Sequence, residues 1–279
     1  MFVLSGFADE IADDLNVQLD VLRQLGIGHL ELRGVWGKNV LALSDSEALA
    51  VRDALRARDV GVSAIGSPIG KIGIDDPFEP HLADFRRALA LAELFECPYI
   101  RLFSFFVPEG AADDYRTPVM ARMSALLEAA QGHPVVLLHE NERHIYGDIP
   151  RRCRDLLETL DSPQFRMTFD PANFVMCDVH PFTEGYELLQ DYVDYVHIKD
   201  GLMAARQVVP AGQGEGQVRE LLSALMARGY DGYLSLEPHL AQAGEFRGFS
   251  GPELFGVAAK SLREVMRELG AEEGPHLPA

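Results

Sequence analysis

Short apolar runs alternate with longer stretches of mixed polarity along the whole chain. Several of these runs are apolar at almost every position, which is typical of strands covered on both faces of a parallel sheet. Eight such runs predict strands at residues 2–5, 29–32, 60–65, 99–103, 135–139, 166–169, 195–198 and 233–236.

The stretches between these runs predict helices. Residues 16–25 carry apolar side chains at helical spacing, which makes one stripe along a helix. Ser44 followed by Glu47 is the pattern of a capping box, so a helix is expected to begin there. Helices often end before a glycine, and Gly26 and Gly270 both follow apolar stretches. Further helices are expected at residues 82–94, 118–130, 150–160, 183–192, 218–228 and 252–269.

The order of these elements predicts an α/β protein. Eight strands that alternate with eight helices are the count of a (β/α)8 TIM barrel. A doubly wound sheet is the alternative, but it usually carries a glycine-rich phosphate loop after the first strand, where this chain reads SGFADEI. Since no linker divides the chain, a single barrel domain is expected over residues 1–270, followed by a flexible C-terminal tail at 271–279.

Composition narrows the class of protein. Of the 279 residues, 47 % are hydrophobic and 24 % are charged, as in a soluble globular protein. The formal net charge of −18 repels phosphate backbones, so nucleic acid is not an expected partner. No apolar run reaches the roughly 18 residues of a membrane span, and the start lacks a basic signal segment. Three widely spaced cysteines indicate reduced thiols, and a cytoplasmic protein without a membrane partner is expected.

Metal-binding side chains stand at the ends of four consecutive predicted strands. VVLLHEN places Glu140 at the tip of the fifth strand, and MTFDPAN places Asp170 at the tip of the sixth. His197 lies near the end of the seventh strand and Glu237 at the end of the eighth. Active residues of such barrels lie at the C-terminal ends of the strands, and neighbouring strands are about 4.8 Å apart. The four side chains are therefore expected to converge on one point.

Each of these residues also has a plainer interpretation. An acidic residue at a strand end is more often a loop or helix-cap residue, and Asp170 before Pro-Ala-Asn has the pattern of a cap. His197 alone reads equally well as a core histidine. Their joint occurrence favours a metal, because crowded carboxylates repel one another and a dication relieves that repulsion. Three carboxylates and one imidazole favour a single divalent ion, Mn, Co, Mg or Zn.

Other residues near the predicted rim are candidates for binding a substrate. Glu31 ends the second strand, and Trp36 in the following loop packs either on a sugar face or between loops. Arg101 binds either a carboxylate or phosphate of a ligand, or pairs with Glu31. Lys199 either holds a substrate oxygen or anchors Asp200.

Three further features of the sequence lead to narrower predictions. His139 is expected to point away from the metal, because adjacent residues of a strand alternate between its faces. Gly212 and Gly214 in GQGEG are expected to shape a turn, since the phosphate-binding fingerprint is absent. Lys71, after the third strand, is a weak candidate for contact with an anion.

At these positions the chain resembles the xylose isomerase-like TIM barrel superfamily, and above all its sugar phosphate isomerase/epimerase group. That group includes ketose 3-epimerases as well as inosose isomerases and dehydratases. The resemblance covers nearly the whole chain. It is carried by FADEI near the start, HEN at 139–141, FDPAN at 169–173, HIKD at 197–200, GQGEG at 212–216 and SLEPH at 235–239.

The resemblance implies that Glu140, Asp170, His197 and Glu237 hold the metal ion. It also implies that Glu140 and Glu237 face each other across a small sugar or polyol as acid and base. The reaction would be an isomerisation or epimerisation, by proton abstraction next to a carbonyl through a metal-stabilised enediolate. Family members often have a substrate-binding histidine three residues after the aspartate, where this chain has Asn173. The departure leaves the metal site intact and weakens an assignment as a 3-epimerase.

Three other functions stay open at this stage. An inosose-type dehydratase would use the same metal and then expel a hydroxyl group. A nuclease resembling endonuclease IV would need more histidines and a less acidic chain. A non-catalytic binding barrel would have no reason to keep all four ligand types. Barrel enzymes of this kind often pair, so a homodimer is one expected state, whereas the identities of the sugar and the metal stay open.

Overall fold

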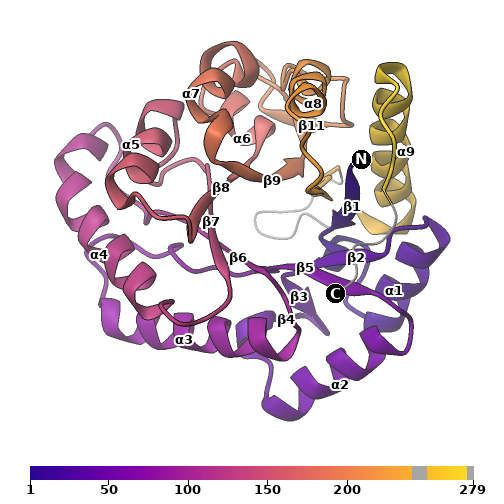
Figure 1. Ribbon diagram of the computed structural model, residues 1–279, viewed down its shortest axis with the longest axis horizontal. Coiled ribbons are helices and arrows are strands. Elements are labelled where there is room, and N and C mark those ends of the chain that lie inside the picture. Colours follow the sequence, from indigo (N-terminus) through magenta and orange to yellow (C-terminus); the bar gives the residue numbers. More distant parts are fainter. Residues whose placement is uncertain (241–249, 275–279) are drawn as a thin grey trace.

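The centre of the computed structural model, which describes residues 1–240 and 250–274, is a sheet of eight parallel strands. The sheet bends into a nearly closed barrel with the strand order β1-β12-β9-β8-β7-β6-β5-β2 (Figure 1). All eight predicted strands are confirmed. They are β1 (Val3–Gly6), β2 (His29–Leu32), β5 (Gly61–Gly66), β6 (Tyr99–Leu102), β7 (Val136–Glu140), β8 (Phe165–Phe169), β9 (Val193–Ile198) and β12 (Tyr233–Leu236).

Helices surround the barrel in the order of the chain, so the predicted (β/α)8 fold is confirmed (Figure 1). The capping box of Ser44 and Glu47 is present at the start of α2. Gly270 ends α9 in the left-handed conformation, with φ of 69°. The α-helices are α1 (Leu15–Gln24), α2 (Asp45–Arg56), α3 (Phe78–Leu94), α4 (Arg116–Ala129), α5 (Pro150–Leu160), α6 (Pro171–Val175), α7 (Glu187–Leu189), α8 (Val218–Ala227) and α9 (Gly251–Leu269).

Three local features differ from the prediction. The single helix expected at 183–192 is a π-helix at Pro181–Tyr186, then α7, then a 3-10 helix at Gln190–Tyr192. Apolar periodicity identifies the buried face of such a segment but does not fix its hydrogen-bond spacing. Two small antiparallel hairpins were also not predicted. They are β3–β4 (Gly34–Val35 and Lys38–Asn39) and β10–β11 (Asp200–Leu202 and Gln207–Val209).

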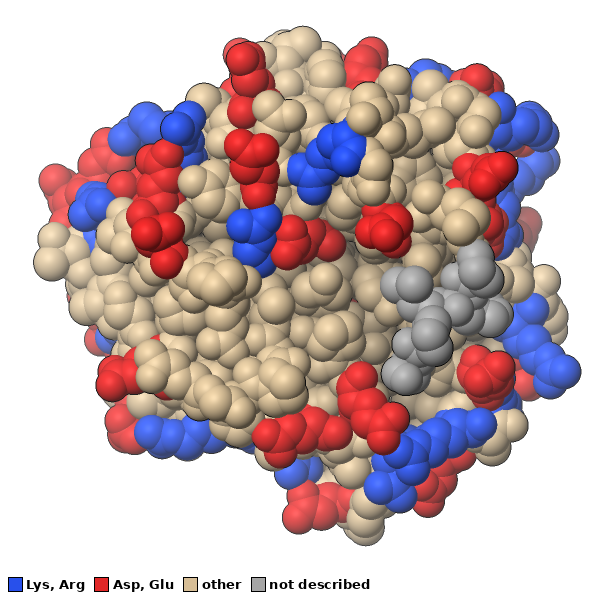
Figure 2. All heavy atoms as spheres, viewed as in Figure 1, with Lys and Arg blue, Asp and Glu red and all other residues tan. Residues whose placement is uncertain are grey.

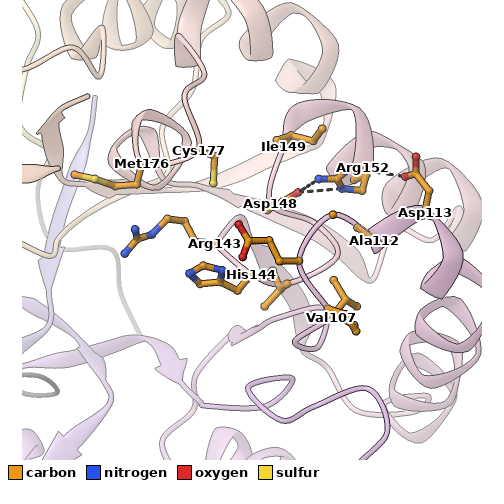
Figure 3. Close-up of a pocket in the computed structure, with 14 residues that line it drawn as sticks. Val107, Ala112, Asp113, Arg143, His144, Asp148, Ile149, Arg152, Met176 and Cys177 are labelled. Atoms are coloured by element: carbon orange, nitrogen blue, oxygen red, sulfur yellow. Dashed lines mark hydrogen bonds and ion pairs between the residues drawn. The ribbon is translucent and has the colours of Figure 1, made fainter. Parts of the chain in front are cut away.

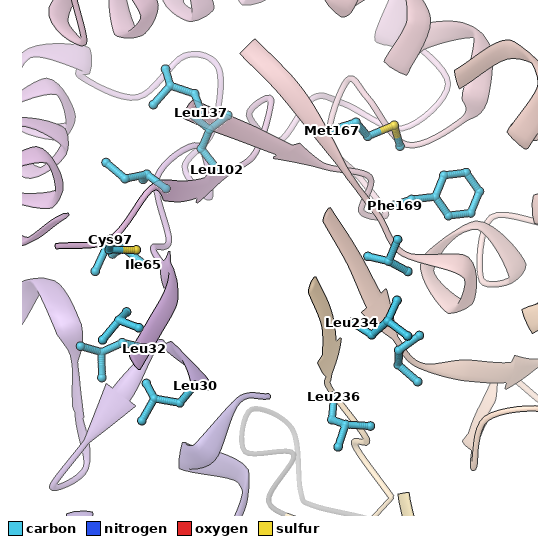
Figure 4. Packing of buried hydrophobic residues seen from close by; sticks show 14 of the residues in the cluster. Leu30, Leu32, Ile65, Cys97, Leu102, Leu137, Met167, Phe169, Leu234 and Leu236 are labelled. Atoms are coloured by element: carbon cyan, nitrogen blue, oxygen red, sulfur yellow. The ribbon is translucent and has the colours of Figure 1, made fainter. Parts of the chain in front are cut away.

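The main hydrophobic core lies between the strands and the helices. Leu30, Leu32, Leu234 and Leu236 are at most 3 % exposed and point outward toward the helices (Figure 4). Figure 4 shows that the side chains drawn there leave the centre of the barrel clear. Successive residues of a strand point to opposite faces, so the residues between these leucines point inward. This alternation directs a set of polar side chains into the barrel.

A floor of aromatic and aliphatic side chains closes the barrel below the polar set. Val3, Leu138, Tyr195 and Tyr233 form a second buried cluster. The Tyr195 hydroxyl lies 2.8 Å from Ser63 Oγ, so this buried polar atom has a partner. The barrel is therefore filled at one end, and only the other end is available for a site.

The beginning of the predicted tail is attached to the barrel. Phe2 donates its backbone N–H to the Glu272 carbonyl at 3.0 Å, and Gly274 donates to the Phe2 carbonyl at 2.7 Å. These bonds lie along the edge of β1 and attach residues 272–274 to it. This part of the chain was expected to be flexible. Residues 275–279 lie outside the described part of the chain.

The outer surface carries both signs of charge. Figure 2 shows Lys, Arg, Asp and Glu gathered toward the edge of the viewed face, with largely uncharged residues in its middle. The chain has a net charge of −18, and on this face acidic and basic residues are interspersed. No broad basic patch of the kind that binds nucleic acid is seen there. All three cysteines are free thiols. No helix among the described residues has the length and apolar character needed to span a bilayer.

Candidate metal centre

The four predicted metal ligands lie together at the C-terminal end of the barrel. Glu140 is the last residue of β7, and Asp170 follows β8 directly. His197 is the last residue but one of β9, and Glu237 follows β12. One ligand atom from each of the four lies within 4.8 Å of the others, and all four residues are buried.

The His197 imidazole faces the three carboxylates with an unpartnered nitrogen. Its Nδ1 lies 3.3 Å from Glu140 Oε1 and 3.8 Å from both Asp170 Oδ2 and Glu237 Oε2. Nδ1 is buried and makes no hydrogen bond. A buried nitrogen without a partner is costly unless another group satisfies it. A cation shared by these four atoms would satisfy all of them, so the residues present fit a divalent metal ion.

The other side of the imidazole is held by Glu31. His197 Nε2 lies 3.0 Å from Glu31 Oε2, and Ser235 Oγ donates to the same oxygen at 2.9 Å. Histidines that bind metals commonly donate their second N–H to a carboxylate, which fixes the ring and its tautomer. Glu31 was expected to contact substrate, but it is only 1 % exposed and lies beneath the imidazole.

Asp170 serves as both a helix cap and a member of the cluster. Its Oδ1 accepts the backbone N–H of Asn173 at 2.8 Å and so caps the short helix α6. Its Oδ2 is left for the cluster. Asn173 also donates its side-chain Nδ2 to Glu140 Oε1 at 3.0 Å. The cap interpretation of Asp170 is confirmed for Oδ1, and it is compatible with a metal-binding role for Oδ2.

Lys199 neutralises two of the carboxylates. Its Nζ lies 2.8 Å from Asp170 Oδ2, where the geometry is that of an ion pair and not of a hydrogen bond, and 2.7 Å from Glu237 Oε2. These are the oxygens that face His197 Nδ1. Burial disfavours the charged ammonium, yet Asp170 and Glu237 hold the pKa of Lys199 well above its usual value. Lys199 thus lies where it would compete with a metal ion for two of the candidate ligand atoms.

Basic side chains surround the two glutamates and hold them ionised. Arg101 donates to Glu140 Oε2 at 2.9 Å, and Arg33 donates to Glu237 Oε1 at 2.9 Å. Burial alone would raise the pKa of Glu140, but His197 and Arg101 lower it to about 2. Burial likewise opposes the charge on Glu237, and Lys199 foremost holds its pKa well below the usual range. Both carboxylates are available as ligands or bases at neutral pH.

The carboxylates have the opposite effect on His197. Burial disfavours the imidazolium, but the charges of Glu31 and Glu140 outweigh it and raise the His197 pKa well above 6.5. A metal ion binds only the neutral imidazole, so metal binding at this site would release a proton.

A cavity of about 250 Å³ opens beside the cluster. Three of the predicted substrate-binding residues line it, namely Arg101, Asn173 and Lys199, together with Glu140 and Glu237. Glu31 and Trp36 are not among its lining residues. Trp36 is 39 % exposed in the turn between β3 and β4, so the structure does not place it over the cluster.

A group of charged residues next to Glu237 was not predicted from the sequence. His239 Nε2 lies 3.0 Å from Glu10 Oε1 and 3.3 Å from Glu237 Oε1. Burial opposes the charged imidazolium, but the adjacent carboxylates raise the pKa of His239 to about 9. Arg33 extends this group by donating to Asp9 Oδ2 at 2.7 Å. The signal was present in the FADEI and SLEPH segments, but their tertiary contact could not be read from spacing.

The GQGEG segment wraps the carboxylate of Asp200. Asp200 accepts backbone N–H bonds from Gly212, Gly214 and Gly216 at 2.8–3.0 Å. A Cβ at position 214 would lie only 2.5 Å from the carbonyl oxygen of Gly201, so glycine is needed there. The predicted turn is thus built on Asp200, and it supports the β10–β11 hairpin whose residue Val208 lines the cavity.

The family model for the xylose isomerase-like TIM barrel matches residues 19–267. This chain belongs to that family. The match covers β2 to α9 and includes all four residues of the candidate metal centre.

Known proteins of this fold are similar to the chain in different degrees. A 2-epi-5-epi-valiolone 7-phosphate 2-epimerase from Actinoplanes sp. is 34 % identical over 110 residues, which is 39 % of this chain and 38 % of that protein. The IolI protein with a bound zinc atom superposes with a TM-score of 0.76 at 14 % identity, over 96 % of this chain and 99 % of that one. The probable 3-DHS dehydratase AsbF from Bacillus anthracis gives 0.74 at 17 % identity, over 94 % and 99 %. The two structures establish similarity of fold.

Proposed function

We propose that this chain is a divalent-metal-dependent isomerase or epimerase of a sugar or polyol, which moves a proton at a carbon next to a carbonyl. One observation carries the proposal. The unpartnered His197 Nδ1 and the oxygens of Glu140, Asp170 and Glu237 face one point at the open end of the barrel. The name of the Actinoplanes relative, an epimerase of a cyclic polyol ketone phosphate, supports this substrate class.

The donor set limits the choice of metal. Three carboxylates and one imidazole suit Mn²⁺, Co²⁺ or Mg²⁺, and also Zn²⁺. When bound, the ion supplies Lewis-acid stabilisation of the negative charge that develops on the carbonyl oxygen. Glu31, which was expected to contact substrate, is assigned instead to positioning His197, because it bonds the ring nitrogen that faces away from the cluster.

The chain's own residues divide the remaining work. Glu140 and Glu237 are the acid–base pair, since both are ionised and both line the cavity. Arg101 orients Glu140 through a bond at 2.9 Å. Lys199 and Asn173 line the same cavity and are assigned to substrate oxygens. An ion held by Asp170 would displace Lys199 from that carboxylate, which would make its ammonium group available to the substrate.

The experiment combines metal analysis with carboxamide variants. About one equivalent of metal per chain is expected by elemental mass spectrometry, and it should be lost in a His197→Ala, Glu237→Ala double variant. Glu140→Gln and Glu237→Gln should each lower turnover of ketoses or inososes by about 100-fold or more. Glu158→Gln, an exposed change on α5, is the matched control. Wild-type turnover in either site variant, or a protein whose stability ignores added metals, would refute the proposal.

A dehydratase is the second candidate, and His239 favours it. With a pKa of about 9, His239 is protonated at neutral pH, and it lines the cavity beside Glu237. A positioned acid of this kind can give a proton to a departing hydroxyl group. Analysis of the product separates the two reactions, because a dehydratase releases water and forms a double bond.

The geometry argues against a multi-metal nuclease. Glu10, Glu237 and His239 form a second group of potential ligands that shares Glu237 with the first. Apart from the shared Glu237, the second group has only Glu10 and His239, which is fewer ligands than a second ion of its own needs. Binding of a single metal per chain is therefore the expected stoichiometry.

A further inference from the structure

A second cavity, the outer cavity, adjoins the cavity of the candidate metal centre, which is the inner cavity. It has a volume of about 290 Å³, and Arg143 and Met176 line both cavities. Its walls include the apolar side chains of Val107 and Ile149 (Figure 3). The two shared residues therefore lie where the two cavities meet.

Of the charged residues that line the outer cavity, Asp113, Asp148 and Arg152 are paired with each other, whereas Glu109 and Arg143 are not. Arg152 donates to Asp148 Oδ1 at 2.9 Å and lies 3.7 Å from Asp113. The guanidinium of Arg143 makes no hydrogen bond or ion pair with any residue in the described ranges, 1–240 and 250–274. In Figure 3 the Arg143 side chain extends toward Met176 and away from the pair of Asp148 and Arg152.

The other cations around the inner cavity also have partners. At its rim, Lys71 Nζ lies 2.9 Å from Glu142 Oε2, and Arg206 lies 2.7 Å from Asp178. Deeper in the inner cavity, Arg33, Arg101 and Lys199 pair with the carboxylates of the cluster. Among the described residues that line the inner cavity, Arg143 is thus the cation that no carboxylate pairs with directly.

We propose that Arg143 binds an anionic group of the substrate, a phosphate monoester or a carboxylate, while the polyol part of the same molecule lies at the metal centre. The inference rests on the proposed function for the position of the polyol. A guanidinium binds such groups through two parallel N–H bonds, and it gains most where no protein carboxylate competes for it. Arg143 stands at the junction of the two cavities, so the anion would lie between them.

The test compares matched pairs of probes on the metal-loaded protein by titration calorimetry. The phosphate pair is D-fructose 6-phosphate beside D-fructose, and the carboxylate pair is D-glucuronate beside D-glucose. At least one anionic probe is expected to bind about tenfold more tightly than its neutral partner. The Arg143→Gln variant should abolish that preference, and Arg143→Lys should retain part of it. The pair that shows the preference identifies the anion.

Arg154→Gln is the matched control, because Arg154 is an exposed arginine of α5 that pairs with Glu158. It should leave the preference unchanged. Equal binding within both pairs, no binding of any probe, or a preference that survives Arg143→Gln would overturn the proposal. Metal content is measured in the same samples. A protein without metal that still binds inorganic phosphate through Arg143 would contradict the proposed function and not the anion site.

Discussion

The contact between Glu31 and His197 allows a quantitative test of the metal centre. Glu31 Oε2 lies 3.0 Å from His197 Nε2 and accepts from Ser235 at 2.9 Å. Glu31→Gln keeps the shape of the side chain and one acceptor oxygen but removes the negative charge. The ring would keep its place, while its Nδ1 would become a weaker donor to the metal.

The expected size of the effect follows from the role of such carboxylates. A carboxylate that accepts the second N–H of a metal-binding histidine typically contributes 10- to 100-fold to metal affinity, or about 1.4–2.7 kcal/mol. Full burial of the pair places Glu31→Gln within this range, because solvent does not screen the contact. Glu31→Ala should lower the affinity further, since it leaves the buried Nε2–H without an acceptor.

The assay is a competition titration with a chromophoric chelator at fixed pH, which reports both affinity and stoichiometry. Glu31→Gln should still bind one metal ion per chain, but more weakly. Glu142→Gln is the control, because Glu142 lines the same cavity and its exposed pair with Lys71 contributes little. Metal affinity within about twofold of wild type in Glu31→Gln would refute the reasoning, and so would an equal loss in Glu142→Gln.

Three further outcomes are expected. Lys199→Met should raise metal affinity at least about tenfold in the same titration, because the ammonium competes for two ligand oxygens; weaker binding would contradict this. Burial lowers the His139 pKa from 6.5 to about 3, so the stability it contributes is present above pH 6.5 and lost as the pH falls toward 3, by about 1.4 kcal/mol per pH unit. Urea unfolding at pH 7 and 5 should show a smaller pH effect in His139→Gln, and an equal effect would refute it. Gly214→Ala should lower the free energy of unfolding by about 2 kcal/mol or more, because the new Cβ would meet the Gly201 carbonyl oxygen. Gly229→Ala is the control, because its Cβ would meet no atom, and it should lower that free energy by about 1 kcal/mol. Equal losses in the two variants would contradict the close packing of the GQGEG turn on Asp200.

The chain order of apolar runs was enough to predict the barrel. Strands buried on both faces need near-continuous apolar runs, and a parallel sheet needs a helix between successive strands. Both patterns can be recognised within short stretches of the sequence. The same logic placed Glu140, Asp170, His197 and Glu237 at one end, because the C-terminal ends of neighbouring parallel strands are adjacent by construction. Their clustering could therefore be predicted before any contact was known.

Only the tertiary structure decided what surrounds those four residues. Glu31 was a rim candidate in the sequence, but the inward alternation of β2 and a register shift between Leu30 and Glu31 place it beneath His197. His239 and Glu10 are 229 positions apart in the chain, and no local pattern brings them together. Such contacts depend on how distant loops fold over the barrel end. Local periodicity thus determined the scaffold and the clustering of the four side chains, whereas the surrounding charges follow from long-range packing that sequence spacing does not record.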